Sequence, residues 1–451
     1  MADLRRLLHE GKPIFGTDGV RGVAGSELTA ELALAIGRAA GSHLRGGPVL
    51  IGRDTRRSGE MLSSALQSGF QSVGIDTVDV GILPSGGISY LTSSSGATMG
   101  AIVSASHNPA DDNGIKLLSS RGTKLADDVE RELEERLRAS GSRAKVGPDV
   151  GTRFIDGDAL ERYVDHLASV SRYNLSGLEI ALDCAHGAAF KAAPMLFERL
   201  KADVVTHAAA PDGTNINAGW GATHPERLAT EAGGRIGLSF DGDADRLIAI
   251  DEDGKVANGD VILAIIARHM KTQGQLKNNR VVATVMSNLG FRKSMAEAGI
   301  DLTETRVGDR YVLEAMQEQR AIVGGEQSGH IIFLDKGSTG DGLLTAVRLL
   351  DVVAGTGKEL RRLRAEAITE YPQILQNVRV GRGVNLDDAG AVWDEVRAVE
   401  RELGDEGRVL VRASGTEPLI RVMVEAPSEE AARRYADRLT SITQSSMGKE
   451  G

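Results

Sequence analysis

Three aspartates, Asp241, Asp243 and Asp245, occupy alternate positions directly after the apolar run at residues 236–240. Side chains at alternate positions of an extended segment project to one side, where three carboxylates would repel one another strongly. A divalent cation between them removes that repulsion, and a ligand set made of oxygens favours a hard ion such as Mg²⁺. The spacing therefore predicts a magnesium site, with an acidic surface turn before Arg246 as the alternative.

Ser106 lies in a short polar segment that follows another apolar run, at residues 101–103. A serine at the end of a strand, beside His107 and stiffened by Pro109, is well placed to be an exposed nucleophile or a phosphate carrier. Turns with a serine and a nearby proline are also common where no chemistry occurs. The segment alone therefore leaves open whether Ser106 is reactive.

The loop at residues 324–330 carries groups suited to binding a sugar. Glu326 and Ser328 can exchange hydrogen bonds with hydroxyls, and His330 titrates near neutral pH, as a general acid or base should. The paired glycines that begin the loop fit an ordinary tight turn equally well. By itself this motif is a weak indication of sugar recognition.

The loop at residues 412–418 joins two predicted strands and gathers basic and hydroxyl side chains. Arg412 and Arg421 supply positive charge, and the hydrogen-bond donors between them are Ser414, Gly415 and Thr416. Such a set can bind a phosphate dianion through several charge-assisted contacts. It is not a Walker loop, because it lacks the Gly-Lys-Ser/Thr pattern, and an ordinary hairpin is the alternative.

The composition fits a folded enzyme of several domains. The chain has 451 residues, 41% hydrophobic and 26% charged, with a formal net charge of −10. This length predicts about three or four domains, and the acidic balance argues against a nucleic-acid binder.

The N-terminus lacks the apolar core of a signal peptide. The longest apolar run, residues 261–267, is too short to cross a membrane and predicts a buried helix. With Cys184 as the single cysteine, we expect a cytoplasmic protein.

Short β-branched runs alternate with helical patterns, which predicts α/β units built on mixed or parallel sheets. One unit runs from a strand at residues 49–51 into a helix for which Ser58 is the expected N-cap. The last ~80 residues indicate an α+β unit, with a helix at 386–403, strands at 409–412 and 421–425, and a helix from Ser428. Changes in pattern predict domains at residues 1–151, 152–253, 254–369 and 370–451, without an exact internal repeat.

The four loops, in this order, closely resemble those of the α-D-phosphohexomutase family, and the resemblance covers the chain from Phe15 to its last helix. Four stretches carry it in detail: residues 15–22 (FGTDGVRG), 212–219 (DGTNINAG) with 223–226 (THPE), 307–311 (VGDRY) and 325–330 (GEQSGH). Within the family, the stretches at residues 15–22 and 325–330 resemble members that act on glucosamine phosphates more closely than they resemble phosphomannomutases. The resemblance implies three similar α/β domains and a smaller α+β C-terminal domain, each contributing one loop to a central cleft.

The resemblance also implies a role for each candidate. Ser106 corresponds to the family's phosphoserine, whose phosphate completes a Mg²⁺ site formed by the three aspartates. Arg21, Lys116 and His330 correspond to basic residues that assist phosphoryl transfer, with Arg246 adding positive charge. The loop at 324–330 corresponds to the sugar-recognition loop, and the loop at 412–418 to a clamp for the distal phosphate.

On this hypothesis phospho-Ser106 donates its phosphoryl group to a sugar monophosphate, forming a bisphosphorylated sugar that turns round and returns its other phosphate. For Lys116 to act as a base, we expect neighbouring arginines to lower its pKa. A Mg²⁺-dependent phosphatase and a non-catalytic sugar-phosphate-binding protein are the alternatives from other classes. We expect a sugar phosphate as the partner, no nucleic acid or membrane, and a homodimer, which is common among similar proteins.

Two segments depart from the family pattern. Residues 83–87 read Leu-Pro-Ser-Gly-Gly where relatives commonly have a Thr-Pro pair, and residues 184–187 read Cys-Ala-His-Gly where relatives commonly have Cys-Ala-Asn-Gly. Neither departure replaces a candidate residue. They bear on local loop conformation and domain packing, and not on the reaction.

Overall fold

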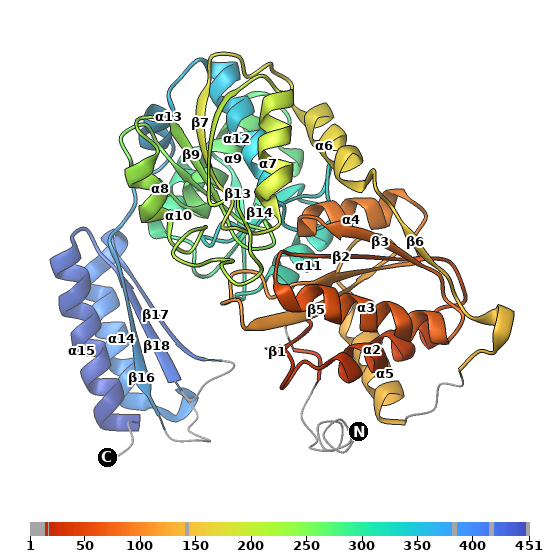
Figure 1. The fold of residues 1–451 in the computed structure, drawn as a ribbon. Coiled ribbons are helices and arrows are strands. Elements are labelled where there is room, and N and C mark those ends of the chain that lie inside the picture. The colour runs from red at the N-terminus through yellow and green to blue at the C-terminus, as the bar shows by residue number, and fades with distance from the viewer. Residues whose placement is uncertain (1–13, 17, 140–143, 381–385, 415–418, 448–451) are drawn as a thin grey trace. The chain divides into compact units, whose positions relative to one another are not determined.

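The structure, a computed structural model, describes residues 14–16, 18–139, 144–380, 386–414 and 419–447 (Figure 1). The chain divides into two compact units, one formed by residues 1–286 and 300–367 and the other by residues 287–299 and 368–451. The first unit contains three mixed sheets, and the second contains a three-stranded antiparallel sheet.

The first sheet has the strand order β1-β5-β4-β2-β3-β6. Its strands are β1 (Val20–Val23), β2 (Val49–Arg53), β3 (Thr77–Ile82), β4 (Met99–Val103), β5 (Asp112–Ser119) and β6 (Arg153–Ile155). The helices of this region are α2 (Ala30–His43), α3 (Arg57–Ser72), α4 (Ser85–Ser94) and α5 (Asp127–Ala139), with a 3₁₀ turn at Gly147–Asp149.

Ser58 is not the N-cap of α3, so that prediction is wrong. The helix begins one residue earlier, and the Ser58 hydroxyl accepts a hydrogen bond from the side chain of Asn113 over 2.9 Å.

The second and third sheets have the orders β11-β10-β9-β7-β8 and β13-β12-β14-β15. The second sheet consists of β7 (Glu179–Asp183), β8 (Asp203–His207), β9 (Ile236–Phe240), β10 (Leu247–Ile250) and β11 (Val256–Ala257), and the third of β12 (Arg280–Thr284), β13 (Asp301–Thr305), β14 (Val323–Gly325) and β15 (Ile331–Phe333). The helices between these strands are α6 (Ala159–Val170), α7 (Ala189–Arg199), α8 (Pro225–Glu231), α9 (Gly259–Thr272), α10 (Leu289–Glu297) and α11 (Asp309–Gln319), and a 3₁₀ turn spans Lys277–Asn279. The helices α12 (Gly342–Thr356) and α13 (Leu360–Ala367) follow β15.

The three mixed sheets share a topology that the sequence does not display as a repeat. In each sheet a central strand, β2, β7 or β12, has two parallel neighbours. One of these neighbours, β4, β9 or β14, is buried throughout and is followed by an antiparallel partner, β5, β10 or β15. The three hairpin connections that result carry Ser106, the aspartates and the segment from Glu326 to His330. The fold therefore places three of the four predicted loops at equivalent positions.

The C-terminal unit is a separate α+β structure, as predicted. Its sheet has the order β16-β18-β17, built from β16 (Gln373–Arg379), β17 (Arg408–Ala413) and β18 (Leu419–Glu425). The helices α14 (Gly390–Leu403) and α15 (Glu429–Met447) pack together against this sheet (Figure 1). The helix predicted at 386–403 is shorter than expected, because residues 386–388 form a 3₁₀ turn, and a second such turn spans Gly404–Glu406.

These observations confirm the predicted fold class, three similar α/β domains with mixed sheets and a smaller C-terminal α+β domain. β6 adds to the first sheet and β11 to the second, although they follow the divisions predicted at residues 151 and 253. The domain boundaries and the central cleft stay predictions.

Among the described residues, no helix is long and apolar enough to cross a membrane. The apolar run at 261–267 lies within α9, where each of its residues is buried, as predicted.

Candidate active site

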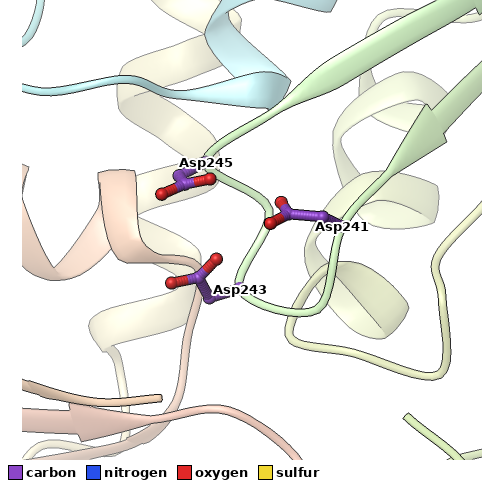
Figure 2. Close-up of side chains that lie close together, drawn as sticks. All are labelled: Asp241, Asp243 and Asp245. Carbon is purple, nitrogen blue, oxygen red and sulfur yellow. The ribbon is translucent and has the colours of Figure 1, made fainter. Parts of the chain in front are cut away.

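The connection between β9 and β10 turns so that its three aspartates face one another. Ala244 adopts a left-handed backbone (φ 58°), and its N–H donates to the carbonyl oxygen of Asp241 over 2.9 Å. As a result, the carboxylates of Asp241, Asp243 and Asp245 converge (Figure 2), and one oxygen from each lies within 4.8 Å of the others. All three side chains are buried. The structure therefore brings the three predicted metal ligands together.

The donor set of this cluster fits a hard divalent cation. Oδ1 of Asp243 and Oδ1 of Asp245 are buried, and neither receives a hydrogen bond from the residues that the structure describes. Burial and the charges of Asp245 and Asp243 raise the pKa of Asp241 well above its usual value, and burial and Asp243 raise that of Asp245. Buried carboxylates of the same charge are costly when some of their oxygens accept no hydrogen bond, and an ion such as Mg²⁺ can satisfy these oxygens together.

The N-terminus of α4 holds Asp243 from another side. The N–H of Ser85 donates to the carbonyl oxygen of Asp243 (2.9 Å), and the Ser85 hydroxyl donates to Oδ2 of the same residue (2.8 Å). Burial raises the pKa of Asp243, but Lys116 and Ser85 outweigh burial, so this pKa lies below its usual value. Ser85 had no predicted role. Its only signal in the sequence is a hydroxyl at a helix start after Pro84, in a segment that departs from the family pattern.

Ser106 lies directly beside the aspartate cluster. Its hydroxyl donates to Oδ2 of Asp241 over 2.6 Å. The residue is only 1% exposed, so the prediction of an exposed serine is wrong, because the aspartate loop packs over its turn. Burial and the charges of Arg246 and Arg21 lower the pKa of the neighbouring His107 to about 4, which keeps this imidazole neutral near pH 7.

A buried arginine, Arg56, holds the main chain around Ser106. Its Nε donates to Oδ2 of Asp54 over 2.9 Å, and both side chains are fully buried. Its remaining hydrogens go to backbone carbonyl oxygens, those of Ser106 (2.9 Å), Asn108 (2.8 Å), Asp112 (3.0 Å) and Pro109. All five guanidinium hydrogens therefore have an acceptor. Arg56 was not predicted, because a sequence does not show that one side chain closes a loop about 50 residues away.

Lys116, on β5, lies between Asp18 and the aspartate cluster. Its Nζ is 3.1 Å from Oδ2 of Asp18, 3.6 Å from Oδ2 of Asp243 and 3.8 Å from Oδ2 of Asp245. Arg21 donates to the same oxygen of Asp18, a residue to which the sequence gave no role. Burial lowers the pKa of Lys116, but the three carboxylates outweigh burial and raise it above its usual value. Arg21 lowers this pKa as expected, but the carboxylates outweigh it, so the expected net lowering of the pKa is wrong.

Arg246 and His330 connect the aspartate loop to the loop between β14 and β15. The two residues form an isolated antiparallel β-bridge. Nε of Arg246 is 3.7 Å from Oδ1 of Asp245, and although burial lowers the pKa of this guanidinium, Asp245 and Asp241 raise it overall. His330 is buried, and its Nδ1 has no hydrogen-bond partner within the described part of the chain. Both predicted basic groups therefore border the metal candidate.

The rest of the β14–β15 loop is a tight turn. The N–H of Glu326 donates to the carbonyl oxygen of His330, and Oε1 of Glu326 accepts from the N–H of Gly308 over 3.1 Å. This bond joins the loop to the stretch 307–311 that carried part of the family resemblance. Ser328 is exposed at the tip of the turn. Both predicted sugar-recognition residues thus lie in this turn, and Ser328 is exposed.

The fourth loop belongs to the C-terminal unit. Arg412 on β17 stands opposite Arg421 on β18 in the antiparallel register. Burial and the charge of Arg421 lower the pKa of Arg412, and within the described residues no carboxylate pairs with either arginine. Ser414 ends the described part of this loop, whereas Gly415 and Thr416 lie outside the described residues. Two adjacent unpaired guanidinium groups suit a phosphate dianion.

Family models match four successive parts of the chain. They describe the α/β/α domains I, II and III of phosphoglucomutase/phosphomannomutase at residues 12–144, 161–254 and 258–371, and the C-terminal domain at residues 375–442. The chain belongs to the phosphoglucomutase/phosphomannomutase family, the phosphohexomutases, and is an enzyme of the phosphate-transferring isomerase class. The predicted family resemblance is confirmed.

Several curated relatives share about half of their residues with this chain. A phosphoglucosamine mutase from an Exiguobacterium species is 48% identical over 449 residues, covering 97% of this chain and 99% of the relative. Another from Bacillus pumilus is 47% identical over 445 residues, with 97% and 99% covered. A third from Listeria monocytogenes is 48% identical over 443 residues, with 96% and 98% covered.

Solved structures agree with the fold. A phosphoglucomutase/phosphomannomutase family protein from Burkholderia thailandensis superposes with a TM-score of 0.81 at 27% identity, covering 96% of this chain and 97% of that protein. An N-acetylphosphoglucosamine mutase from Aspergillus fumigatus, solved with GlcNAc-6P and magnesium, has a TM-score of 0.68 at 18% identity, with 99% and 98% covered. The second likeness concerns the fold alone.

Proposed function

We propose that this protein is a phosphoglucosamine mutase, which interconverts glucosamine 6-phosphate and glucosamine 1-phosphate for UDP-N-acetylglucosamine synthesis. The observation that carries the proposal is the hydrogen bond of 2.6 Å from Ser106 to Asp241, in a chain 48% identical to a phosphoglucosamine mutase over nearly its whole length. The bond joins a phosphate-carrier candidate to a metal-binding candidate, the two parts that phosphoryl transfer through a serine requires.

Ser106 is proposed to be a phosphoserine in the active enzyme. The bond between phosphorus and Oγ of Ser106 breaks as phosphorus bonds to the free hydroxyl oxygen of the sugar monophosphate, whose proton leaves to a basic group. The bisphosphorylated sugar then turns round. The bond between its other phosphorus and the second sugar oxygen breaks as that phosphorus bonds to Oγ of Ser106, and the second sugar oxygen takes up a proton to become the new free hydroxyl. The sugar monophosphate is thereby converted into its positional isomer, and the enzyme regains its phosphoserine.

Asp241, Asp243 and Asp245 are proposed to hold one Mg²⁺ together with the serine phosphate. When bound, Mg²⁺ neutralises charge on the transferring phosphoryl group. Arg21 and Arg246 add fixed positive charge near Ser106, since the charges of both lower the pKa of the neighbouring His107. Lys116 and His330 are the candidates for handling the hydroxyl proton.

Glu326 and Ser328 are proposed to recognise the sugar, and Arg412, Ser414, Gly415, Thr416 and Arg421 to bind the phosphate that is not reacting. A single clamp can serve both half-reactions, because the intermediate presents one phosphate to it in each orientation. We also propose a cytoplasmic location and a homodimer, as expected from the sequence and from similar proteins.

The test is a comparison of kcat/KM for glucosamine, glucose and mannose phosphates on the same preparation. We expect glucosamine 6-phosphate to exceed both others by at least about 10-fold, because a site that pairs with an amino group leaves polar atoms unpaired when that group is absent. A preference for mannose or glucose phosphate would replace the proposal by another mutase activity of the same family. Release of inorganic phosphate without isomerised product would indicate a phosphatase.

A further inference from the structure

The stretch at residues 212–219 carried part of the family resemblance, but none of the roles above uses it. Its residue Asn217 has a left-handed backbone (φ 59°), and its N–H donates to the carbonyl oxygen of Ala185 over 2.9 Å. The residue is only 8% exposed. Asparagine tolerates this backbone better than most residues, so the turn can direct its side chain inward at little cost.

The side-chain amide of Asn217 donates to the turn that carries Ser106. Nδ2 lies 2.9 Å from the carbonyl oxygen of Ser106 and 3.0 Å from that of Asn108. Nη2 of Arg56 contacts the same two oxygens, at 2.9 and 2.8 Å. Each carbonyl oxygen has two lone pairs, so each is held by two donors from different parts of the chain. The main chain is therefore fixed on both sides of His107.

The turn at Ser106 needs this support. Ser106 has a φ of 51°, a left-handed conformation that is unfavourable for a residue with a Cβ and persists only where its surroundings enforce it. Its N–H donates to the hydroxyl of Ser104 over 2.9 Å. The aspartate loop packs directly on the same contact, because a Cβ at Gly242 would lie 2.5 Å from the Ser106 carbonyl oxygen and 2.8 Å from Nδ2 of Asn217.

We propose that Asn217 is a positioning residue, which fixes the turn of Ser106 so that Oγ stays directed at the aspartate site during both phosphoryl transfers. This inference rests on the proposed role of Ser106 as phosphate carrier. Asn217 acts through two backbone carbonyls, without contact to the reacting atoms. A looser turn lowers the fraction of molecules with Oγ aligned, so the transfer rate falls while sugar-phosphate binding stays unchanged.

Two substitutions distinguish a hydrogen-bonding role from a space-filling one. Asn217→Gly removes the amide and keeps the left-handed backbone, whereas Asn217→Asp keeps the size but places carboxylate oxygens against the two carbonyl oxygens. We expect kcat to fall about 10-fold in Asn217→Gly and further in Asn217→Asp, with KM for glucosamine 6-phosphate within about twofold of wild type. The rate of a single phosphoryl transfer from phospho-Ser106, measured by rapid quench, should fall to the same extent. The reverse order, Gly worse than Asp, would overturn the inference in favour of packing.

Asn215→Gly is the matched control. Asn215 lies in the same stretch, and its side chain donates to the carbonyl oxygen of Ala210 and accepts from the N–H of Asp212, each over 3.0 Å. These bonds stay within residues 210–215 and do not reach the turn of Ser106. We expect Asn215→Gly to keep kcat within about twofold of wild type, because its side-chain bonds go to Ala210 and Asp212 and not to the turn of Ser106. An equal loss in both glycine variants would assign the effect to general loosening of the stretch and overturn the inference.

Hydrogen exchange separates this inference from the proposed function, because it requires no substrate. Exchange of peptides that span residues 104–112 should be at least about threefold faster in Asn217→Gly than in wild type or Asn215→Gly. Inactivity of the wild-type protein on glucosamine phosphates with this exchange response would reject the proposed function and support the positioning role. Unchanged exchange and unchanged kcat would overturn the positioning role. If Asn217→Gly fails to fold, the same exchange measurement is made on Asn217→Asp.

Discussion

Two turns of this protein hold charge in opposite ways. The β9–β10 turn buries three carboxylates, and Oδ1 of Asp243 and of Asp245 accept no hydrogen bond from the described residues. At the β17–β18 turn, the two strands place Arg412 opposite Arg421, both only partly buried. A buried acidic site is suited to holding a resident cation, whereas an open basic pair can take up an anion and release it. We therefore expect the first turn to govern the chemical step and the second to govern binding.

The largest expected effect lies beside the acidic turn. Ser106→Ala removes the proposed phosphate carrier, so kcat should fall by at least about 10³-fold. Mutase turnover and the melting temperature are measured together, and the melting temperature should stay close to that of wild type. Turnover near the wild-type level would show that Ser106 does not carry the phosphate, and it would contradict the expectation that the acidic turn governs the chemical step.

Asp243→Asn tests the cation requirement of the acidic turn. Losing one ligand charge should lower kcat about 10²-fold and weaken Mg²⁺ binding, measured by calorimetry, with little change in KM. Asp253→Asn is the matched control, because Asp253 is an exposed carboxylate paired with Arg361 at 3.0 Å. Wild-type activity that persists in EDTA would contradict the metal assignment.

Arg412→Ala tests the basic turn. A charge-assisted contact to phosphate is worth roughly 1.5–3 kcal/mol, so KM should rise about 10- to 100-fold while kcat changes much less. Arg433→Ala provides the control, since Arg433 is an exposed helix residue that pairs with Glu429 at 3.1 Å. A fall in kcat at constant KM would break the division of roles between the two turns.

Ser85→Ala should have the smallest effect. The substitution removes the hydroxyl bond of 2.8 Å to Asp243 but leaves the backbone bond to the same residue. We expect Mg²⁺ affinity to fall about threefold to 10-fold, a modest case of losing a group that orients a ligand. Ser85→Thr, which keeps the hydroxyl, should stay near wild type. An unchanged affinity in Ser85→Ala would show that α4 does not orient Asp243.

Local patterns predicted most of what is local. Alternating carboxylates after a buried strand predicted the grouping of Asp241, Asp243 and Asp245, and the strand and helix patterns after residue 370 predicted the α+β unit. Ser58 was mistaken for an N-cap, because any hydroxyl near a helix start resembles one in sequence. The shared topology of three sheets was invisible as a repeat, since burial and strand order, and not residue identity, define it.

The contacts that sequence could not predict join distant positions. Ser85 reaches Asp243, 158 residues away, and Asn217 reaches Ser106, 111 residues away. The errors about the exposure of Ser106 and the pKa of Lys116 have the same origin. Each depends on which distant segments cover the residue, and for Lys116 the nearest charges are carboxylates from two other segments. Spacing along the chain carries no information about such neighbours.

The common hairpin position has a consequence for how substrate choice can change. The β14–β15 turn begins and ends on the paired residues Gly325 and Ile331. We therefore expect that its tip around Ser328 can be exchanged for that of a relative without shifting the register of either strand, provided that Gly329 keeps its hydrogen bond from Leu247 and His330 keeps its bridge to Arg246. If Glu326 and Ser328 recognise the sugar as proposed, sugar preference is in this sense modular: evolution or protein engineering can change the tip of one hairpin while the contacts at its base keep the geometry of the aspartate loop.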